Sequence, residues 1–281
     1  MRFGFVTCVQ LGLSCMEAIY DVGGTLDLAI TLEDDMAKTK SGRVYLDDFC
    51  AARSIELRKV RNINKPDSIA AIREHELDWL FIIGWSQIAR EEVLQAPAEG
   101  VIGMHPTLLP VGRGRAAIPW AILKNLDETG VTMFQLDTGV DTGPMLAQKA
   151  IPLGPQTDAS DLYDEVDRCH IALMKDVFPK LRSGLITPVP QDALKATEWP
   201  GRKPEDGLID LNGSVADAER LVRAVTRPYP GAFADFGKGR LIVWSARIAA
   251  AGQADDSDAP VLTFPDGKLV LTDWEWAPPQ E

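Results

Sequence analysis

Apolar and polar positions along the first two thirds of the chain follow two periods, one typical of buried strands and one typical of helices. Strands are predicted where short apolar runs occur, at 2–9, 26–32, 55–60, 79–85, 129–137 and 145–153. Helices are predicted where apolar residues recur every three or four positions, at 12–23, 46–53, 67–78, 116–126 and 157–184. Because strand and helix alternate with short connections, the pattern predicts an α/β fold with a Rossmann-like, mostly parallel sheet.

Capping residues mark the expected ends of two of these helices. Asp67 is the expected N-cap of the helix at 67–78, and Thr157 or Ser160 is the expected N-cap of the long amphipathic helix. Gly184 is expected to end that long helix, because glycine adopts the left-handed conformation of a helix C-terminus at little cost.

The composition changes after residue 184. Residues 185–207 are rich in proline and polar residues, and the pattern beyond them predicts one helix and several short strands, at 214–226, 241–249, 259–264 and 268–276. Turns are expected at 237–239 and 266–267. We therefore expect a catalytic domain at 1–188, a linker at 189–207 and a smaller, mostly-β, OB-like domain at 208–281.

Charge and composition narrow the class of protein. The net charge of −12 argues against nucleic acid as the main partner, because phosphate binding needs an excess of Lys and Arg. The four cysteines show neither a CxxC pair nor metal-ligand spacing, which is typical of buried thiols in a reducing compartment. No apolar run is long enough to span a membrane, and the first residues are typical of a strand rather than a signal peptide, so we expect a cytoplasmic protein.

Several common chemistries lack their sequence signals. The first strand-to-helix turn has no GxGxxG, and the chain has no P-loop and no HExxH. Ser86 follows a strand, but Ile88 stands where a nucleophile elbow needs a small residue. The three histidines, His75, His105 and His170, do not have the spacing of metal ligands, so no metal is expected.

The sequence predicts that His105 lies in a loop punctuated by proline and glycine, directly after an apolar segment. The surrounding sequence "GMHPTLLPVGRGRAAIPWAI" and the later "ETGVTMFQLDTGVDTGPML" resemble the formyltransferases that use 10-formyltetrahydrofolate. That family includes glycinamide ribonucleotide formyltransferase, methionyl-tRNA formyltransferase and the nucleotide-sugar N-formyltransferases of bacterial surface polysaccharides, such as lipopolysaccharide O-antigen. "WLFIIGWSQIAREEVLQAP" looks like the family's folate-binding strand and loop. "EWPGRKPEDGLIDL" and "LVRAVTRPYPGAF" look like the start of the C-terminal domain of the tRNA and sugar enzymes.

The resemblance implies a catalytic role for two residues and reveals one departure. The family's catalytic His corresponds to His105 and its catalytic Asp to Asp141, while the catalytic Asn would fall at Gly103. A histidine beside the formyl carbonyl stabilises the developing oxyanion by roughly 3–4 kcal/mol. A nearby carboxylate favours the charged imidazole and can accept the amine's proton. These roles require the loops of His105 and Asp141 to converge, which we expect at the carboxyl ends of neighbouring parallel strands.

The same resemblance implies which residues bind ligands. The folate cosubstrate would contact seven residues of two loops: Trp85, Ser86, Gln87, Ile88, Asp137, Gly139 and Val140. Arg113 and Arg115 could pair with phosphate through their planar guanidinium groups. Thr107 is a candidate substitute for the missing Asn donor, as are a backbone N–H and a water.

The amine acceptor is the open question. From Gln191 to Glu281 there are 15 Asp and Glu against 10 Lys and Arg, a net charge of −5, which counts against tRNA. The GRGR and GRKPEDG stretches resemble the sugar branch, notably the enzyme acting on a uridine-diphosphate amino-arabinose. We therefore expect a nucleotide-linked amino sugar. Methionyl-tRNA, an amino acid or siderophore precursor, hydrolysis of the folate without an acceptor, and a non-catalytic folate or nucleotide-sugar binder stay open as alternatives.

The C-terminal part offers two further hypotheses. Arg223, Arg227 and Tyr229 could bind a nucleotide or simply turn the chain. Trp274 and Trp276 could pack against a second subunit of a homodimer or belong to the domain's own core.

Overall fold

The computed structural model describes residues 1–39, 42–237, 239–250 and 259–278. The chain folds into two compact units that interleave along the sequence. Unit 1 comprises Met1–Arg113, Gly130–Ala150 and Val166–Glu198, and unit 2 comprises Gly114–Thr129, Ile151–Glu165 and Trp199–Glu281. Each unit contains residues that precede position 188 and residues that follow it. The domain boundaries expected from the sequence stay a prediction.

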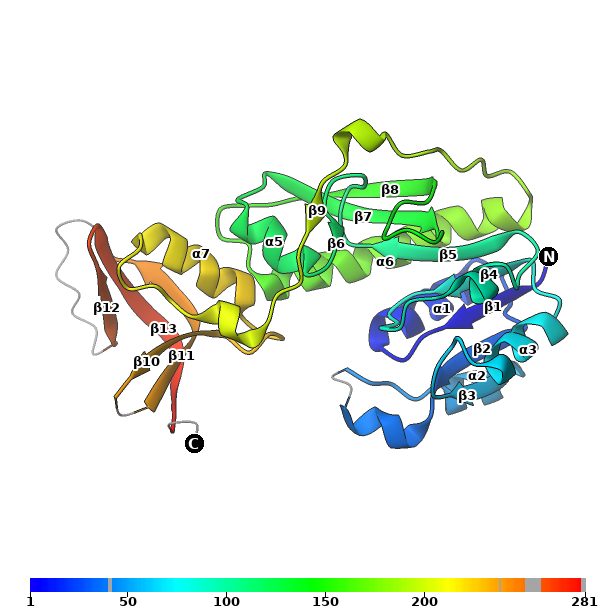
Figure 1. Cartoon of the computed structure of the whole chain (residues 1–281), viewed down its shortest axis with the longest axis horizontal. Coiled ribbons are helices and arrows are strands. Elements are labelled where there is room, and N and C mark those ends of the chain that lie inside the picture. The colour runs from blue at the N-terminus through cyan, green and yellow to red at the C-terminus, as the bar shows by residue number, and fades with distance from the viewer. Residues whose placement is uncertain (40–41, 238, 251–258, 279–281) are drawn as a thin grey trace. The chain divides into compact units, whose positions relative to one another are not determined.

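A seven-stranded sheet with the order β3-β2-β1-β4-β5-β7-β8 organises the N-terminal region (Figure 1). Its strands are β1 (Phe3–Val6), β2 (Leu28–Leu32), β3 (Glu56–Val60), β4 (Trp79–Ile82), β5 (Gly100–His105), β7 (Glu128–Gln135) and β8 (Met145–Pro152). The pairs among β1 to β5 are parallel, whereas β5 and β7 run antiparallel, with His105 opposite Thr132. The predicted α/β fold with a mostly parallel sheet is confirmed.

Alternate residues of the central strands face two different helical layers, because successive side chains of a strand point to opposite faces. On one face Phe3 and Phe81 pack against Phe178 of α6 (Ala159–Arg182), and α6 is tied to α1 (Gln10–Asp21) by the Lys175–Asp21 ion pair at 2.8 Å. The opposite face packs on α3 (Pro66–Glu74) and α4 (Glu91–Leu94) through buried aliphatic residues, among them Val6, Ile30, Leu80, Ile69, Ile72 and Val93. Helix α2 (Asp47–Arg53) lies between β2 and β3 in the chain.

Two helix starts differ from the sequence-based expectation. α3 begins at Pro66, one residue before the expected cap Asp67, because proline suits the first helical position, where no backbone N–H is needed. The start of α6 is capped by neither Thr157 nor Ser160; the Asp158 carboxylate accepts the N–H of Asp161 instead. The C-terminal stop is as predicted, since Gly184 has a φ of +65° just beyond α6.

Unit 2 contains a four-stranded antiparallel sheet with the order β10-β11-β13-β12. Its strands are β10 (Ala232–Phe236), β11 (Gly239–Ile248), β12 (Val261–Phe264) and β13 (Gly267–Ala277), of which β10 was not predicted. Helix α7 (Val215–Val225) packs on this sheet and also on α5 (Ala117–Leu123). The smaller mostly-β part expected from the sequence is thus confirmed.

The stretch 189–207, predicted as a linker, contains short ordered elements. They are the 3-10 helices η2 (Ala193–Lys195) and η3 (Pro204–Gly207) and the strand β9 (Glu198–Trp199), which pairs with β6 (Arg113–Gly114). A further 3-10 helix, η1 (Asp34–Thr39), follows β2. Among the described helices none combines the length and apolarity that a bilayer crossing requires.

Candidate active site

His105 is the last residue of β5 rather than a loop residue as expected, because its backbone pairs with Thr132 of β7. The hydrogen bonds of its ring distinguish its two nitrogens. Nε2 lies 2.8 Å from the carbonyl oxygen of Gly112, which can only accept a hydrogen bond, so Nε2 carries a proton. Nδ1 faces the Asp141 carboxylate at 3.6 Å. Because the side chains of His105 and Asp141 are only 10% and 18% exposed, their interaction is screened less than a surface pair. Nδ1 is therefore the nitrogen that can exchange a proton with a ligand.

Asp141 lies in the hairpin loop between β7 and β8 and has a φ of +54°. The turn before it is organised by Asp137, whose carboxylate accepts the N–H of Gly139 and the hydroxyl of Thr142. The two catalytic candidates meet as predicted, but not for the reason predicted. β7 is antiparallel to β5, so the loop that carries Asp141 does not follow the carboxyl end of a strand parallel to β5. The loop instead returns toward His105.

Gly103, where the resemblance places an Asn, lies on β5 two residues before His105. A Cβ at this position would lie 2.7 Å from Cδ2 of Leu136. Leu136 is half-buried and packs against the aliphatic cluster on the α3 face of the sheet. The apolar side chain of Leu136 thus fills space that a side chain at position 103 would need.

Thr107 is held in the loop that follows His105. Its backbone N–H donates to the carbonyl of His105 at 2.9 Å, and its carbonyl accepts the Thr132 hydroxyl at 2.7 Å. The Thr107 hydroxyl is fully buried and has no hydrogen-bond partner among the described residues. Such an unpaired buried group is rare, which keeps Thr107 a candidate donor for a ligand.

The four residues of the predicted folate loop after β4 fall into different environments. Trp85 is half-buried against the aliphatic core cluster, and its indole N–H has no partner within the described part of the chain. Ile88 is 82% exposed. Gln87 is occupied, because its side chain accepts from the N–H of Ile63 and donates to the carbonyl of Arg61. Ser86 is exposed, as are Asp137, Gly139 and Val140 of the second predicted folate loop.

The two arginines expected to pair with phosphate have different surroundings. Arg113 is half-buried, and its Nε and Nη2 donate to the side-chain oxygen of Gln191 at 3.2 and 2.8 Å. The Arg115 side chain is exposed, while its backbone N–H donates to the carbonyl of Trp199. Gln191 was not a candidate from the sequence, since it lies in the stretch predicted as a linker.

His170 of α6 is fully buried, and its Nδ1 donates to the carbonyl of Val166 at 2.7 Å. Burial lowers the pKa of His170 from 6.5 to about 4, and the charge of His105 contributes further in that direction. His170 is therefore neutral at pH 7 and has a structural role. His75 lies far from it in sequence, at the end of α3, with Nε2 3.1 Å from the Glu56 carboxylate.

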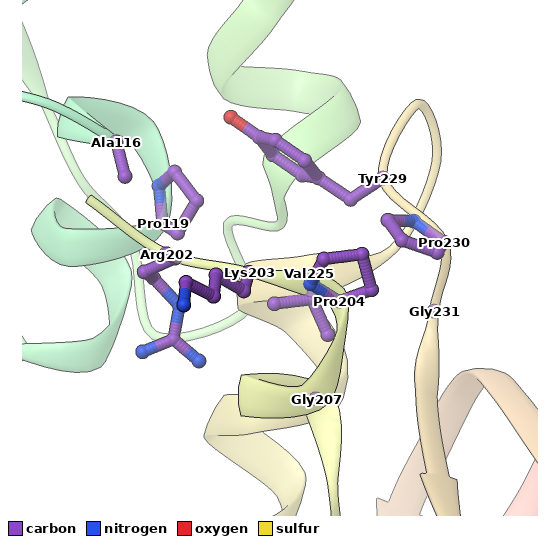
Figure 2. A pocket seen from close by; sticks show the side chains of 10 residues that line it. All are labelled: Ala116, Pro119, Arg202, Lys203, Pro204, Gly207, Val225, Tyr229, Pro230 and Gly231. Carbon is purple, nitrogen blue, oxygen red and sulfur yellow. The ribbon is translucent and has the colours of Figure 1, made fainter.

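Unit 2 contains a separate small pocket of about 160 Å³ (Figure 2). Its walls are mostly apolar, from Pro119, Pro204, Val225 and Pro230, and the half-buried Arg202 lies at one side. The Arg202 guanidinium stacks 5.1 Å from the centre of the Trp120 ring and donates to the carbonyl of Asp206. Burial lowers the pKa of Arg202, an effect that the Asp206 carboxylate opposes.

The C-terminal candidates have internal partners. Arg223 pairs with Glu219 and donates to the carbonyl of Thr157, and Arg227 pairs with Asp273. Tyr229 lines the pocket, and its hydroxyl lies 3.0 Å from that of Tyr163. Trp274 and Trp276 of β13 are 37% and 52% exposed. Among the described residues no group of three His, Cys, Asp or Glu side chains could hold a metal ion.

A His–Asp pair beside a strand end of an open α/β sheet is typical of an enzyme that moves protons during a group transfer. The comparison with known protein families identifies the group that is transferred. Residues 34–177 match the formyl transferase family, and residues 202–275 match the C-terminal domain of formyl transferases. The chain belongs to this family and is an enzyme that transfers formyl groups.

Solved structures share the fold over nearly the whole chain. The N-formyltransferase from Helicobacter canadensis, in complex with folinic acid and dTDP-3-aminofucose, is 15% identical with a TM-score of 0.73, covering 98% of this chain and 100% of that one. The sugar 3N-formyl transferase WlaRD is 16% identical with a TM-score of 0.71, covering 96% and 97%. Methionyl-tRNA formyltransferase from Clostridium thermocellum is 17% identical with a TM-score of 0.63, covering 99% of each chain.

Proposed function

We propose that this enzyme moves a formyl group from 10-formyltetrahydrofolate to the amino group of a nucleotide-linked amino sugar. The observation that carries the proposal is the pairing of His105 Nδ1 with the Asp141 carboxylate at 3.6 Å, next to the end of β5. Formyl transfer to an amine needs a polarised carbonyl and a proton acceptor, and this pair can supply both.

In the proposed reaction the neutral amine attacks the formyl carbon, and a C–N bond forms while negative charge builds on the formyl oxygen. Since Nε2 is committed to the Gly112 carbonyl, the donor to that oxygen is a protonated Nδ1. The Asp141 carboxylate accepts the proton of the attacking amine. As the oxyanion returns to a carbonyl, the bond from the formyl carbon to N10 breaks, and N10 takes up the proton that Asp141 accepted, to give tetrahydrofolate.

The absence of a side chain at Gly103 leaves the oxyanion with fewer donors than the resemblance implies. Thr107 supports the proposal that a replacement exists, because its hydroxyl is buried and unpaired among the described residues. For the folate, we propose contacts with the loop of Trp85, Ser86, Gln87 and Ile88 and with Asp137, Gly139 and Val140. The Gln87 side chain is held in place for such a contact, since its amide bonds Arg61 and Ile63 with one N–H and its oxygen.

The amino-sugar acceptor is proposed from the net charge of residues 191–281 and from Arg113 and Arg115. Residues 191–281 carry 15 acids against 10 bases, and a polyanionic tRNA binds poorly to a surface of net negative charge. One of the similar structures is described as a sugar 3N-formyl transferase, and another, an N-formyltransferase, holds dTDP-3-aminofucose. For this chain we propose that Arg115, whose side chain is exposed, contacts the diphosphate together with Arg113.

The test is release of tetrahydrofolate from 10-formyltetrahydrofolate in the presence of UDP-, dTDP- and GDP-linked amino sugars, with mass spectrometry of the product. A formylated sugar that the wild type makes and His105→Ala does not make would support the proposed activity, the proposed acceptor and the proposed role of His105. Methionyl-tRNA and free amino acids serve as competing acceptors. Turnover with one of these instead, or folate binding without turnover of any acceptor, would overturn the proposed substrate.

A further inference from the structure

We propose that Gln191 is a positioning residue, which sets the Asp141 carboxylate against His105. Its side chain joins two loops that lie about fifty and eighty residues away in sequence. The amide nitrogen donates to the carbonyls of Asp141 and Gly143 at 2.8 and 2.7 Å. The amide oxygen accepts both N–H groups of Arg113, at 3.2 and 2.8 Å.

All hydrogen-bonding atoms of the Gln191 amide are used in this arrangement. The two N–H groups bind the backbone on either side of residue 142, directly at the residue that carries the catalytic carboxylate. Such support matters at Asp141, because its φ of +54° lies in the left-handed region, which costs any non-glycine residue some free energy, although Asp and Asn adopt it more readily than others. The contact to Arg113 links this loop to the chain that follows Gly112, the acceptor of His105 Nε2.

The chain on either side of Gln191 makes the same connection through its backbone. Val189 and Met145 exchange two hydrogen bonds of 2.8 Å at the start of β8. Thr197 accepts the N–H of Gly112 through its hydroxyl and the N–H of Arg113 through its carbonyl. Residues 189–198 therefore contact the loop of Asp141 at one end and the loop of His105 at the other.

The inference rests on the proposed roles of His105 and Asp141 in formyl transfer. Gln191→Glu keeps an oxygen for Arg113 but places a carboxylate oxygen against two carbonyls, so the Asp141 loop should move. Since small misplacements at a reacting centre cost up to about 100-fold in rate, we expect kcat to fall by about 10- to 100-fold, with KM for 10-formyltetrahydrofolate changed by less than about threefold. Gln135→Glu is the matched control, because it makes the same change at a side-chain hydrogen bond to the carbonyl of Glu99.

A double-mutant cycle separates positioning from a general loss of structure. In an Asp141→Asn background the carboxylate that Gln191 positions is absent, so Gln191→Ala should lower kcat, measured at saturating amino sugar, by less than about threefold. Independent losses that multiply in the double variant would overturn the inference, as would wild-type kcat in Gln191→Ala.

Crystal structures of the wild type and of Gln191→Ala provide a test that needs no acceptor. We expect the Asp141 carboxylate to leave His105 Nδ1 in the variant; an unchanged contact would overturn the inference. If no amino sugar is turned over but the loop moves, the proposed acceptor fails and the role of Gln191 stands. If an amino sugar is turned over equally by wild type and Gln191→Ala, the proposed function stands and the role of Gln191 fails.

Discussion

The Leu136 side chain occupies the space that a side chain at Gly103 would need: a Cβ on residue 103 would lie 2.7 Å from Leu136 Cδ2. Gly103→Asn is therefore expected to destabilise the protein by about 1–3 kcal/mol, the usual cost of overpacking. Leu136→Ala opens the space, so the double variant should lose less stability than the sum of the two single changes. Urea denaturation of the four proteins checks this. Gly103→Asn with wild-type stability would show that Leu136 rearranges freely.

The contact between His105 and Asp141 predicts that removal of the Asp141 charge lowers the reaction rate and leaves the fold intact. Asn adopts the left-handed backbone of Asp141 readily, so Asp141→Asn removes the charge while leaving the turn in place. We expect kcat to fall by roughly 10²-fold or more, as for removal of a general base, with little change in thermal stability. Tetrahydrofolate release and a melting curve measure the two quantities. Asp164→Asn, the same change on an exposed face of α6, is the control and should keep full activity.

The buried hydroxyl of Thr107 can be tested for a catalytic role by an isosteric change. Thr107→Val replaces the hydroxyl by a methyl group and removes an unpaired buried polar atom, so stability should stay equal or rise. If the hydroxyl donates to the oxyanion, kcat falls by about 10²-fold, while Thr107→Ser, which keeps the hydroxyl, retains most activity. Equal rates for Thr107→Val and the wild type would assign the missing donor to a different group.

His170 predicts how stability depends on pH. Its pKa is lowered from 6.5 to about 4 in the folded state, so the unfolded state binds the proton first as the pH falls. The contribution of His170 to stability is complete above about pH 6.5 and is lost progressively toward pH 4. At pH 5 the loss amounts to about 2 kcal/mol.

Chemical denaturation between pH 7 and pH 5 measures this loss. His170→Asn keeps a side-chain N–H for the Val166 carbonyl and should make the fall in stability shallower. His75→Gln is the control, since that histidine lies beside Glu56 at the end of α3 and its loss should leave the contribution of His170 in place. An equally steep fall in His170→Asn would assign the pH dependence to other groups.

Periodicity predicted most strands and helices of the sheet, because the strands are short apolar runs and the helices bury one regular face, but it did not predict the central strand β5. It failed where local geometry decides: Pro66 displaced the expected cap Asp67, and Asp158 capped α6 in place of Thr157 or Ser160. The pairing of His105 and Asp141 was predicted through the resemblance, but the antiparallel course of β7 was not.

Gln191 could not be found from periodicity or composition. A stretch of proline and polar residues has the composition of a linker whether or not its side chains bind something. Hydrogen bonds such as those of Gln191 to Arg113 and to the Asp141 loop distinguish the two cases, and they connect residues that are distant in sequence.

Residues 189–198 also limit how this enzyme can be divided. A fragment that ends at residue 188 would retain every strand of the seven-stranded sheet, yet it would lack Gln191 and Thr197. With the proposed role of Gln191, the reaction centre is completed by residues that follow α6. Exchange of C-terminal modules between relatives, in the laboratory or in evolution, would preserve a working centre only if the junction falls beyond this stretch.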